Sequence, residues 1–322
     1  MLKERIIKTL KIIIPISIGV YLTWYFFSNS SVVERQHMVA AFKGANYWWI
    51  MVALVVAFLS HLSRAYRWKY LLHPLGYKPK LSLMYHSVMI GYIINLTIPR
   101  SGELARAGYF SKYHKASADK IFGTIVVERV IDLIMFGLVI FIAGLLQTDQ
   151  EQFNQIKATQ TEGVPSWILP AFLIFITTFS LIIIISKKIR RKLIKFAKGI
   201  LEGCLTILKL KQKTAFIFHT VFIWGAYLAM FWLTALALPD VANISLNATF
   251  ACFVAGAIAI GVTPGGIGLY PIMVASVLTG LYGFEGETAK SFSMLMWSTQ
   301  TIFIVALGLI SLFAIQYQKK EI

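Results

Sequence analysis

The stretch from Asn95 to Arg106 carries residues that could bind an anion inside a strongly apolar region. Pro99 cannot continue the apolar helix before it, whereas Ser101 can cap a new helix whose first turn holds Glu103. The sequence therefore predicts a helix, a break and a second helix, with Arg100 and unbonded backbone N–H groups at the break. Helix starts of this kind bind anions, and arginine grips a phosphate with two parallel hydrogen bonds.

A second break lies around Thr263, Pro264, Gly265 and Gly266. The two glycines lack Cβ atoms, so a ligand can approach the backbone closely there. We expect both breaks to form one substrate site, with these residues from the second break and, from the first, Arg100, Ser101, Gly102, Glu103 and Arg106. The alternative for the first break is structural: Glu103 pairs with Arg106 or Arg100 and holds the break closed.

A third group of charges lies in the apolar run that follows. Glu128, Arg129 and Asp132 are three and four residues apart, so their side chains share one sector of a helix. Charges inside a membrane span are costly and usually functional. We expect these three side chains to contribute to the substrate site by facing Arg100 and Arg106. A self-contained Arg129–Asp132 pair near the membrane surface is the alternative.

The composition is that of a multi-pass membrane protein: 57% of the 322 residues are hydrophobic, 14% are charged, and the mean hydropathy is +0.70. The net charge of +17 follows from basic cytoplasmic loops, which argues against a nucleic-acid partner. Cys204 and Cys252 lie far apart, so neither a disulfide framework nor a metal site is indicated. No cofactor or catalytic motif is recognisable, and the N-terminus reads as an uncleaved first helix.

The basic segments set the topology. Positive residues cluster at the N-terminus, at 63–80, 112–120 and 187–213, and at the C-terminus, so these segments are expected in the cytoplasm. The acidic or weakly charged connections at 28–47, 147–167, 239–240 and 284–290 are expected outside. The apolar runs are Leu10–Phe27, Trp48–Leu62, Leu83–Ile98, Ile121–Leu146, Ile168–Ser186, Ala215–Leu238, Ala248–Val262, Ile267–Tyr282 and Phe292–Ile315.

Each full span carries the chain to the other side of the membrane. Two segments whose flanking loops are both expected on the same side must therefore enter and leave the membrane on that side. Residues 81–114 are predicted to form a re-entrant helical hairpin from the cytoplasm, and 248–283 a second one from the opposite side. Six full spans remain: 10–27, 48–62 extended toward Trp68, 121–146, 168–186, 215–238 and 292–315. The predicted fold is an all-α, inverted-repeat transporter-like single domain over residues 1–322, with a basic interfacial helix at 187–210. Eight or nine ordinary kinked spans are the alternative.

Three motifs in order resemble the flippase-like family, also called the lysylphosphatidylglycerol synthase transmembrane region. They run from Pro99 to Arg106, from Glu128 to Asp132 and from Thr263 to Gly268. This family includes YbhN-type proteins and the membrane half of the multiple peptide resistance factor, whose substrate is aminoacylated phosphatidylglycerol. The resemblance implies movement of lipids between leaflets. That last member also has a soluble aminoacyl-transferase domain after its membrane part, for which this sequence shows no counterpart, so the synthesis of aminoacyl lipids is not implied.

The leading hypothesis is therefore a lipid flippase, not an enzyme, in the bacterial cytoplasmic membrane with both termini inside. Its substrate would be a phosphate-containing lipid, namely a phospholipid, an aminoacyl-phospholipid or a polyprenyl-phosphate-linked lipid. The alternatives are a membrane transferase that uses Glu103, Glu128 or Asp132 as a general base, and a non-transporting partner of a lipid-modifying enzyme. The expected partners are membrane lipids with an anionic headgroup, and a homo-oligomer is left open.

Overall fold

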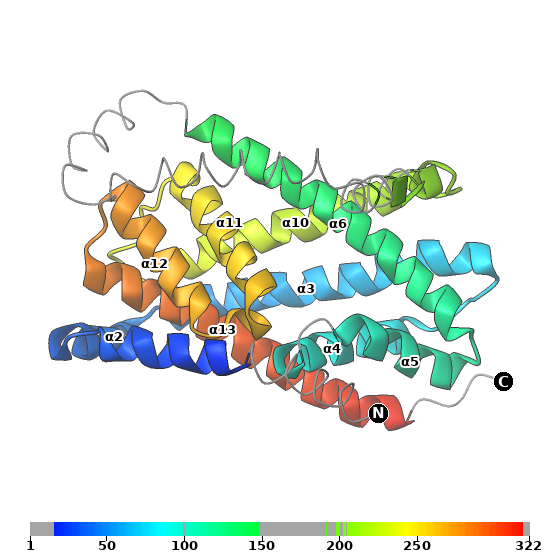
Figure 1. Cartoon of the computed structure of the whole chain (residues 1–322), viewed down its shortest axis with the longest axis horizontal. Coiled ribbons are helices and arrows are strands. Elements are labelled where there is room, and N and C mark those ends of the chain that lie inside the picture. The colour runs from blue at the N-terminus through cyan, green and yellow to red at the C-terminus, as the bar shows by residue number, and fades with distance from the viewer. Residues whose placement is uncertain are drawn as a thin grey trace. The chain divides into compact units, whose positions relative to one another are not determined.

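A computed structural model describes residues 16–98, 101–147 and 205–317, together with residues 191, 198, 199, 202 and 203. Within these residues every regular element is a helix (Figure 1). The chain divides into two compact units. Unit 1 comprises Met1–Ile125 and Gln212–Ile322, and unit 2 comprises Val126–Lys211.

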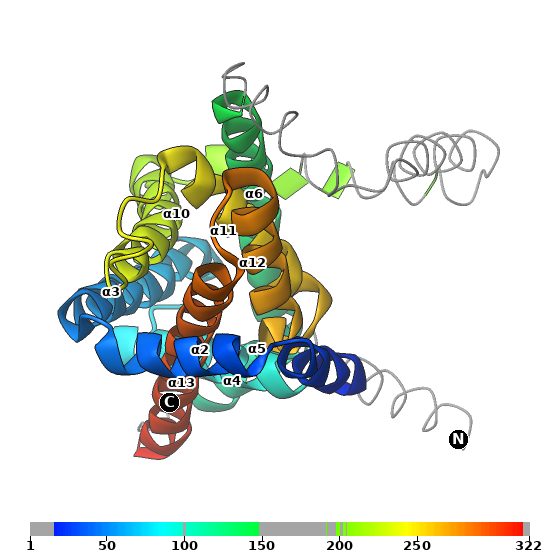
Figure 2. The ribbon, with the colours of Figure 1, turned by 90° about the vertical axis from the view of Figure 1, so that its left-hand side faces the viewer.

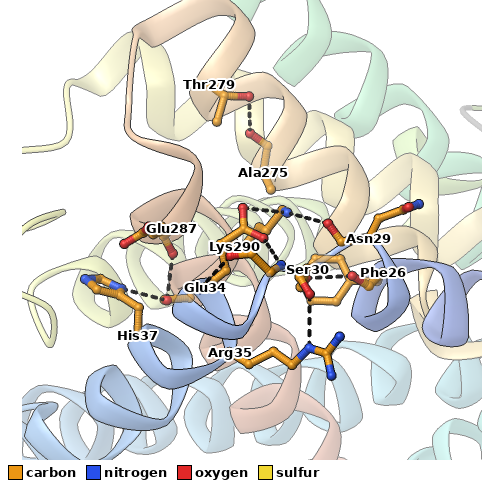
Figure 3. Close-up of polar contacts among 12 residues, drawn as sticks. Phe26, Asn29, Ser30, Glu34, Arg35, His37, Ala275, Thr279, Glu287 and Lys290 are labelled. Carbon is orange, nitrogen blue, oxygen red and sulfur yellow. Dashed lines mark hydrogen bonds and ion pairs between the residues drawn. The ribbon is translucent and has the colours of Figure 1, made fainter.

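A short helix follows the first apolar helix, Ile16–Ser28, where the sequence predicts only an external connection. Helix α2 (Val32–Gly44) starts with a capping box, in which the Ser31 hydroxyl accepts the Glu34 N–H and the Glu34 carboxylate accepts the Ser31 N–H. Lys290 Nζ lies 2.8 Å from Glu34 Oε1 and joins α2 to the start of α13, as Figure 3 shows. The connection predicted at 28–47 therefore contains a helix that the sequence analysis did not anticipate, and its place outside the membrane stays a prediction.

Helix α3 (Tyr47–Leu72) begins at an Asn46 cap and runs well past the apolar core of the predicted span. A short 3-10 helix, η1 (His73–Leu75), follows and ends at Gly76, whose φ of 85° is a left-handed conformation that glycine adopts without strain. The predicted extension of this span toward Trp68 is confirmed, and it takes Arg64 and Arg67 of the basic segment 63–80 into the helix. Both lie inside α3 and are buried.

The first predicted hairpin is a pair of packed helices, α4 (Leu81–Thr97) and α5 (Gly102–His114). Two glycines let them approach closely. A Cβ atom on Gly102 would overlap the carbonyl oxygen of Gly91, so no larger residue fits at this crossing. Pro99 and Arg100, which lie between the helices, fall outside the described residues.

The second predicted hairpin is built in the same way. Helix α11 (Leu246–Val262) is followed by the 3-10 turn η2 (Pro264–Gly266) and by α12 (Leu269–Tyr282), which packs back against α11. The ring of Tyr270 occupies the space beside Gly256 in which a Cβ atom would lie. Both hairpins are therefore helix–break–helix units whose arms are held close by a glycine.

The remaining long helices are α6 (Ala118–Leu146), α10 (Lys213–Ala235) and α13 (Gly286–Ala314), the last continued by η3 (Ile315–Tyr317). Helix α13 begins within the segment 284–290, which was predicted to be an external connection, and it packs on α2, α4 and α12. Helix α10 lies along α3 (Figures 1 and 2). The predicted span 168–186 and most of the predicted basic helix 187–210 lie outside the described residues.

Apolar helices of two length classes are present among the described residues. Three are long and apolar enough to cross a membrane: Tyr47–Leu75, Lys213–Ala235 and Gly286–Tyr317. Four shorter apolar helices accompany them: Ile16–Ser28, Leu81–Thr97, Leu246–Val262 and Leu269–Tyr282. Three of the short helices are arms of the two hairpins.

Candidate functional site

A side chain from α4 caps the N-terminus of α5. Asn95 Oδ1 accepts the backbone N–H of Gly102 at 2.7 Å, and Asn95 Nδ2 lies 3.5 Å from Glu103 Oε2. Ser101 occupies the predicted N-cap position, but its hydroxyl donates to the Ile98 carbonyl at 2.6 Å and caps nothing. The Ser101 N–H also donates to Ile98 O, at 3.3 Å. The prediction of unbonded amides at this break is thus wrong for Ser101 and Gly102.

Arg106 lies one turn into α5 and is buried against an aromatic ring of α3. Its guanidinium carbon is 3.7 Å from the centre of the Trp68 ring, close enough for a strong cation–π contact. Trp68 is itself fully buried and fixed, because its indole Nε1–H donates to Thr124 Oγ1 at 2.8 Å. The guanidinium therefore has a defined orientation, with one face on the indole and its N–H groups directed along the plane.

The second break has an equally defined geometry. Gly265 has φ of 59°, and its carbonyl oxygen accepts a hydrogen bond from Trp297 Nε1 of α13 at 2.9 Å. Thr263 is buried and donates its hydroxyl to the Ala259 carbonyl at 3.2 Å. Gly266 is also left-handed, with φ of 75°. These positions require glycine because a Cβ atom makes the left-handed region costly.

The two breaks lie next to each other within unit 1. The Cδ2 atom of Leu96, at the end of α4, occupies the space in which a Cβ atom on Gly265 would lie. In Figure 1 the hairpins α4–α5 and α11–α12 extend in opposite directions from this point. The sequence-predicted residues Ser101, Gly102 and Glu103 thus lie at the tip of one hairpin, and Pro264, Gly265 and Gly266 at the adjacent tip of the other.

The charges of α6 lie in unit 2. Glu128 and Asp132 are buried, while the Arg129 side chain is 41% exposed, with Nη1 at 3.5 Å from Asp132 Oδ2. The Arg129–Asp132 pair, one of the two alternatives from the sequence, is therefore present. That the three side chains face Arg100 and Arg106 stays a prediction.

Three side chains that contact the breaks or Arg106 were not predicted as site residues from the sequence: Asn95, Trp297 and Trp68. No local pattern points to Asn95 or Trp297, because each bonds to a break on another element.

Comparison with known proteins identifies the family to which the chain is similar. The family described as the lysylphosphatidylglycerol synthase TM region matches residues 12–308, which include both breaks and the charges of α6. A UPF0104 membrane protein of Methanocaldococcus jannaschii is 25% identical over 177 residues, 53% of this chain and 50% of that protein. The chain thus spans about half the length of this curated relative. No solved structure matches the chain.

Proposed function

The chain belongs to the lysylphosphatidylglycerol synthase TM region family, and on this premise we propose that it moves a phosphate-containing lipid between the two leaflets of its membrane. It is a multi-pass helical membrane protein, and its family is tied to lipid handling. The substrate class in this proposal is a phospholipid, an aminoacyl-phospholipid or a polyprenyl-phosphate-linked lipid, which share a lipid phosphate.

The observation that carries the proposal is the meeting of the two hairpins at their breaks, where Leu96 contacts Gly265. The four arms have 17, 13, 17 and 14 residues. At 1.5 Å per residue they are about 20–26 Å long, shorter than the roughly 30 Å hydrocarbon core. We take both hairpins as re-entrant from opposite sides, because broken backbone at membrane depth requires surrounding protein or a water-filled cavity.

The chemistry of the proposed site is that of a phosphate clamp. The positive end of the α5 dipole lies at the first break, beside Arg100 in the sequence. Arg106 is held one turn further along, and a guanidinium stacked on an indole keeps the planar fork that matches two phosphate oxygens. The glycines of the second break allow a lipid phosphate to approach the backbone closely. Rocking of one hairpin against the other would expose this site to each leaflet in turn.

The proposed topology places the protein in a bacterial inner membrane, with both termini and the basic loops on the cytoplasmic side. Ser117 lies in the connection after α5, and Thr161 lies in the predicted external loop. A single cysteine at Ser117 should react with an impermeant thiol reagent from the cytoplasmic side only, and one at Thr161 from the outside only. Reaction of both from the same side would overturn the two re-entrant hairpins.

Transport itself is tested with purified protein in vesicles of phosphatidylcholine and phosphatidylglycerol that carry a fluorescent phospholipid. An impermeant quencher added outside reacts only with probe in the outer leaflet, so probe from the inner leaflet should be lost much faster in vesicles with wild-type protein than in empty vesicles. Arg100→Ala removes a charged contact to the phosphate, which costs on the order of 2–5 kcal/mol of binding, so flipping should fall at least about tenfold. Arg100→Lys should also lose most activity, because an ammonium makes no paired N–H contacts.

Two further variants separate a substrate role from a structural one. Glu103→Gln should lower thermal stability if Glu103 pairs with an arginine, but it should spare or strengthen lipid binding if the arginines serve the phosphate. Arg106→Ala should reduce flipping per folded protein if Arg106 faces the site. Wild-type flipping by Arg100→Ala, normalised to folded protein, would exclude this break as the lipid route.

A further inference from the structure

Helix α2 has one side packed on α13 and another side that is exposed. On the packed side Met38 is buried, and Lys290 Nζ of α13 lies 2.8 Å from Glu34 Oε1. His37 Nδ1 lies 3.2 Å from Ser291 Oγ, also in α13. These contacts fix the rotation of α2 about its axis, and they therefore determine which side chains point away from the protein.

The exposed side of α2 forms a shallow, open hollow of about 490 Å³. We name this side the outer face of α2. Its six residues are exposed and share one side of the helix: Val32, Arg35, Gln36, Val39, Ala40 and Lys43. The outer face thus combines an apolar surface with two cations and contains no carboxylate.

Arg35 is oriented for an anion outside the protein. Its Nε donates to the carbonyl oxygen of Ser30 at 3.0 Å. Ser30 is itself buried and donates its hydroxyl to the Phe26 carbonyl at 2.7 Å. Figure 3 shows the terminal nitrogens of Arg35 pointing away from the contact between Glu34 and Lys290. One edge of the guanidinium is therefore fixed, and the two Nη groups can donate to two oxygens of a phosphate.

Exposed aromatic side chains before and after α2 indicate its level in the membrane. Trp24 and Tyr25 lie near the end of the preceding apolar helix, and Tyr47 and Trp48 begin α3; all four are exposed. Tryptophan and tyrosine collect at the boundary between the hydrocarbon core and the lipid headgroups. With 13 residues, α2 is about 20 Å long and too short to cross the membrane. A helix with valines and cations on one face lies along that boundary.

The charges of the outer face favour an anionic lipid over a second copy of this chain. A symmetric dimer pairs the same patch of both copies. Arg35 and Lys43 of one copy would then meet the same cations of the other copy, and like charges across an interface repel. Glu34 does not offset them, because it is bonded to Lys290 on the packed side. An anionic phospholipid supplies both an opposite charge and acyl chains for the valines.

We propose that the outer face of α2 binds anionic phospholipids of the outer leaflet. Arg35 grips the phosphate diester of one lipid, and Lys43, about 12 Å further along the helix, attracts a second headgroup. Val32 and Val39 contact the acyl chains. This binding surface goes beyond the proposed function, since it requires no transport. Its assignment to the outer leaflet rests on the proposed topology, whereas lipid binding does not.

The test measures fluorescence quenching at the outer face in whole protein reconstituted in vesicles. A fluorophore is attached at Ala40→Cys in protein that also carries Cys204→Ser, while the other natural cysteine, Cys252, is fully buried. Lipids with brominated acyl chains quench a fluorophore only on contact, and brominated phosphatidylglycerol is compared with brominated phosphatidylcholine. Phosphatidylglycerol should be preferred at least about fivefold, which corresponds to the roughly 1 kcal/mol that one cation near an anionic membrane contributes.

Matched variants assign the preference to the two cations. Arg35→Gln/Lys43→Gln should abolish the preference while phosphatidylcholine still quenches. Lys78→Gln/Lys213→Gln removes two exposed cations elsewhere in the same unit and should keep it. A fluorophore at Ile302→Cys, an exposed position within the α13 span, should be quenched equally by both lipids. Added salt gives a second test without altering the cations, because screening should weaken the preference.

Several results would overturn the proposal. Absence of quenching at residue 40 by either lipid would place the outer face in water. Equal quenching by both lipids would mean that the face does not select anionic lipid, and a preference that survives Arg35→Gln/Lys43→Gln would belong to other residues. A disulfide between the Ala40→Cys positions of two copies, formed without quenching, would make the face a contact between copies.

Two further outcomes separate this proposal from the proposed function. If phosphatidylglycerol is preferred but Ala40→Cys reacts with an impermeant thiol reagent from the cytoplasmic side, the outer-leaflet assignment and the proposed topology fail while lipid binding stands. If the preference is present and the protein moves no lipid between leaflets, the proposed function fails and the lipid-binding face stands.

Discussion

Asn95 Oδ1 accepts the backbone N–H of Gly102 at 2.7 Å, so the last turn of α4 caps the first turn of α5. The bond occupies an amide that is then not available to an anion, and it links the end of α4 to the start of α5. In the proposed function, affinity for an anion at this break therefore comes mainly from side chains such as Arg100 and Arg106, supported by the helix dipole.

Replacement of Asn95 by alanine should remove this cap and lower the stability of the protein. Loss of a helix cap costs about 0.5–2 kcal/mol, and the value should be toward the upper end because the Asn95 amide also lies near Glu103. We expect a lower thermal unfolding midpoint in detergent. Thr97→Ala, at the exposed end of the same helix, is the control and should change the midpoint far less. Equal midpoints for Asn95→Ala and wild type would show that the cap contributes nothing.

Gly265 should not tolerate alanine. Its φ of 59° costs a residue with a Cβ atom about 1–2 kcal/mol, and the new methyl group would overlap Leu96 Cδ2. The midpoint of Gly265→Ala should fall, and Leu96→Ala should relieve the overlap but not the backbone cost. The double variant should therefore be more stable than the sum of the two single changes predicts, by about 0.5–3 kcal/mol.

The control for this comparison of single and double variants is Gly261→Ala, four residues earlier, in α11. Among the described residues, no atom of another element lies within 4 Å of a Cβ atom placed there. An alanine inside a helix is favoured over glycine by roughly 0.5–1 kcal/mol, so this variant should be neutral or more stable. If the stability losses of Gly265→Ala and Leu96→Ala simply add in the double variant, the two hairpin tips are not energetically coupled.

The helix ends at the breaks followed from local chemistry, and the sequence predicted them closely. Helix α4 ends at Thr97 and α11 at Val262, each within one residue of the end of a predicted apolar run, because proline cannot continue either helix. Helix α2 was missed although Ser31 and Glu34 form a capping box, since this segment has little apolar periodicity. The charges at the end of α3 predicted a cytoplasmic segment from residue 63 on, whereas the helix continues through them to Leu72, four residues beyond the predicted extension toward Trp68.

The candidate site was predictable in its residue types but not in its hydrogen bonding. Proline, glycine and arginine at the breaks are visible in the sequence, and the contact of Leu96 with Gly265 agrees with the predicted meeting of the tips. That Asn95 replaces Ser101 as the cap depends on how closely Gly91 and Gly102 let α4 and α5 approach. Trp297 reaches the Gly265 carbonyl from α13, and no sequence rule links positions so far apart.

The contact between α2 and α13 should make stability depend on pH. The hydrogen bond from Lys290 Nζ lowers the pKa of the Glu34 carboxyl, an effect that burial partly opposes. Because the folded pKa is below the ordinary value, the stabilisation is complete above the ordinary value and is lost as pH falls through the folded pKa. Wild type should therefore unfold at a higher temperature than Glu34→Gln at about pH 7, and the difference should disappear near about pH 3.

The size of this effect is bounded by the partial exposure of the pair, with 24% of Lys290 and 18% of Glu34 accessible. Pairs of this kind contribute about 1 kcal/mol or less. Glu285→Gln removes an exposed carboxylate at the start of α13 and serves as the control. A wild-type advantage that persists unchanged at the acidic end would rule out Glu34 as its source.

The last prediction concerns the indole under Arg106. Trp68→Phe keeps an aromatic face but weakens the cation–π contact and removes the N–H bonded to Thr124. The smaller ring also leaves space in a fully buried site, so stability should fall by about 1–3 kcal/mol. Because Arg106 is then less firmly oriented, flipping per folded protein should also drop several-fold. Trp48→Phe, at a ring that is 70% exposed, should change neither quantity. If Trp68→Phe lowers only the unfolding midpoint and lipid moves at the wild-type rate, the indole supports the fold alone and Arg106 needs no such support for transport.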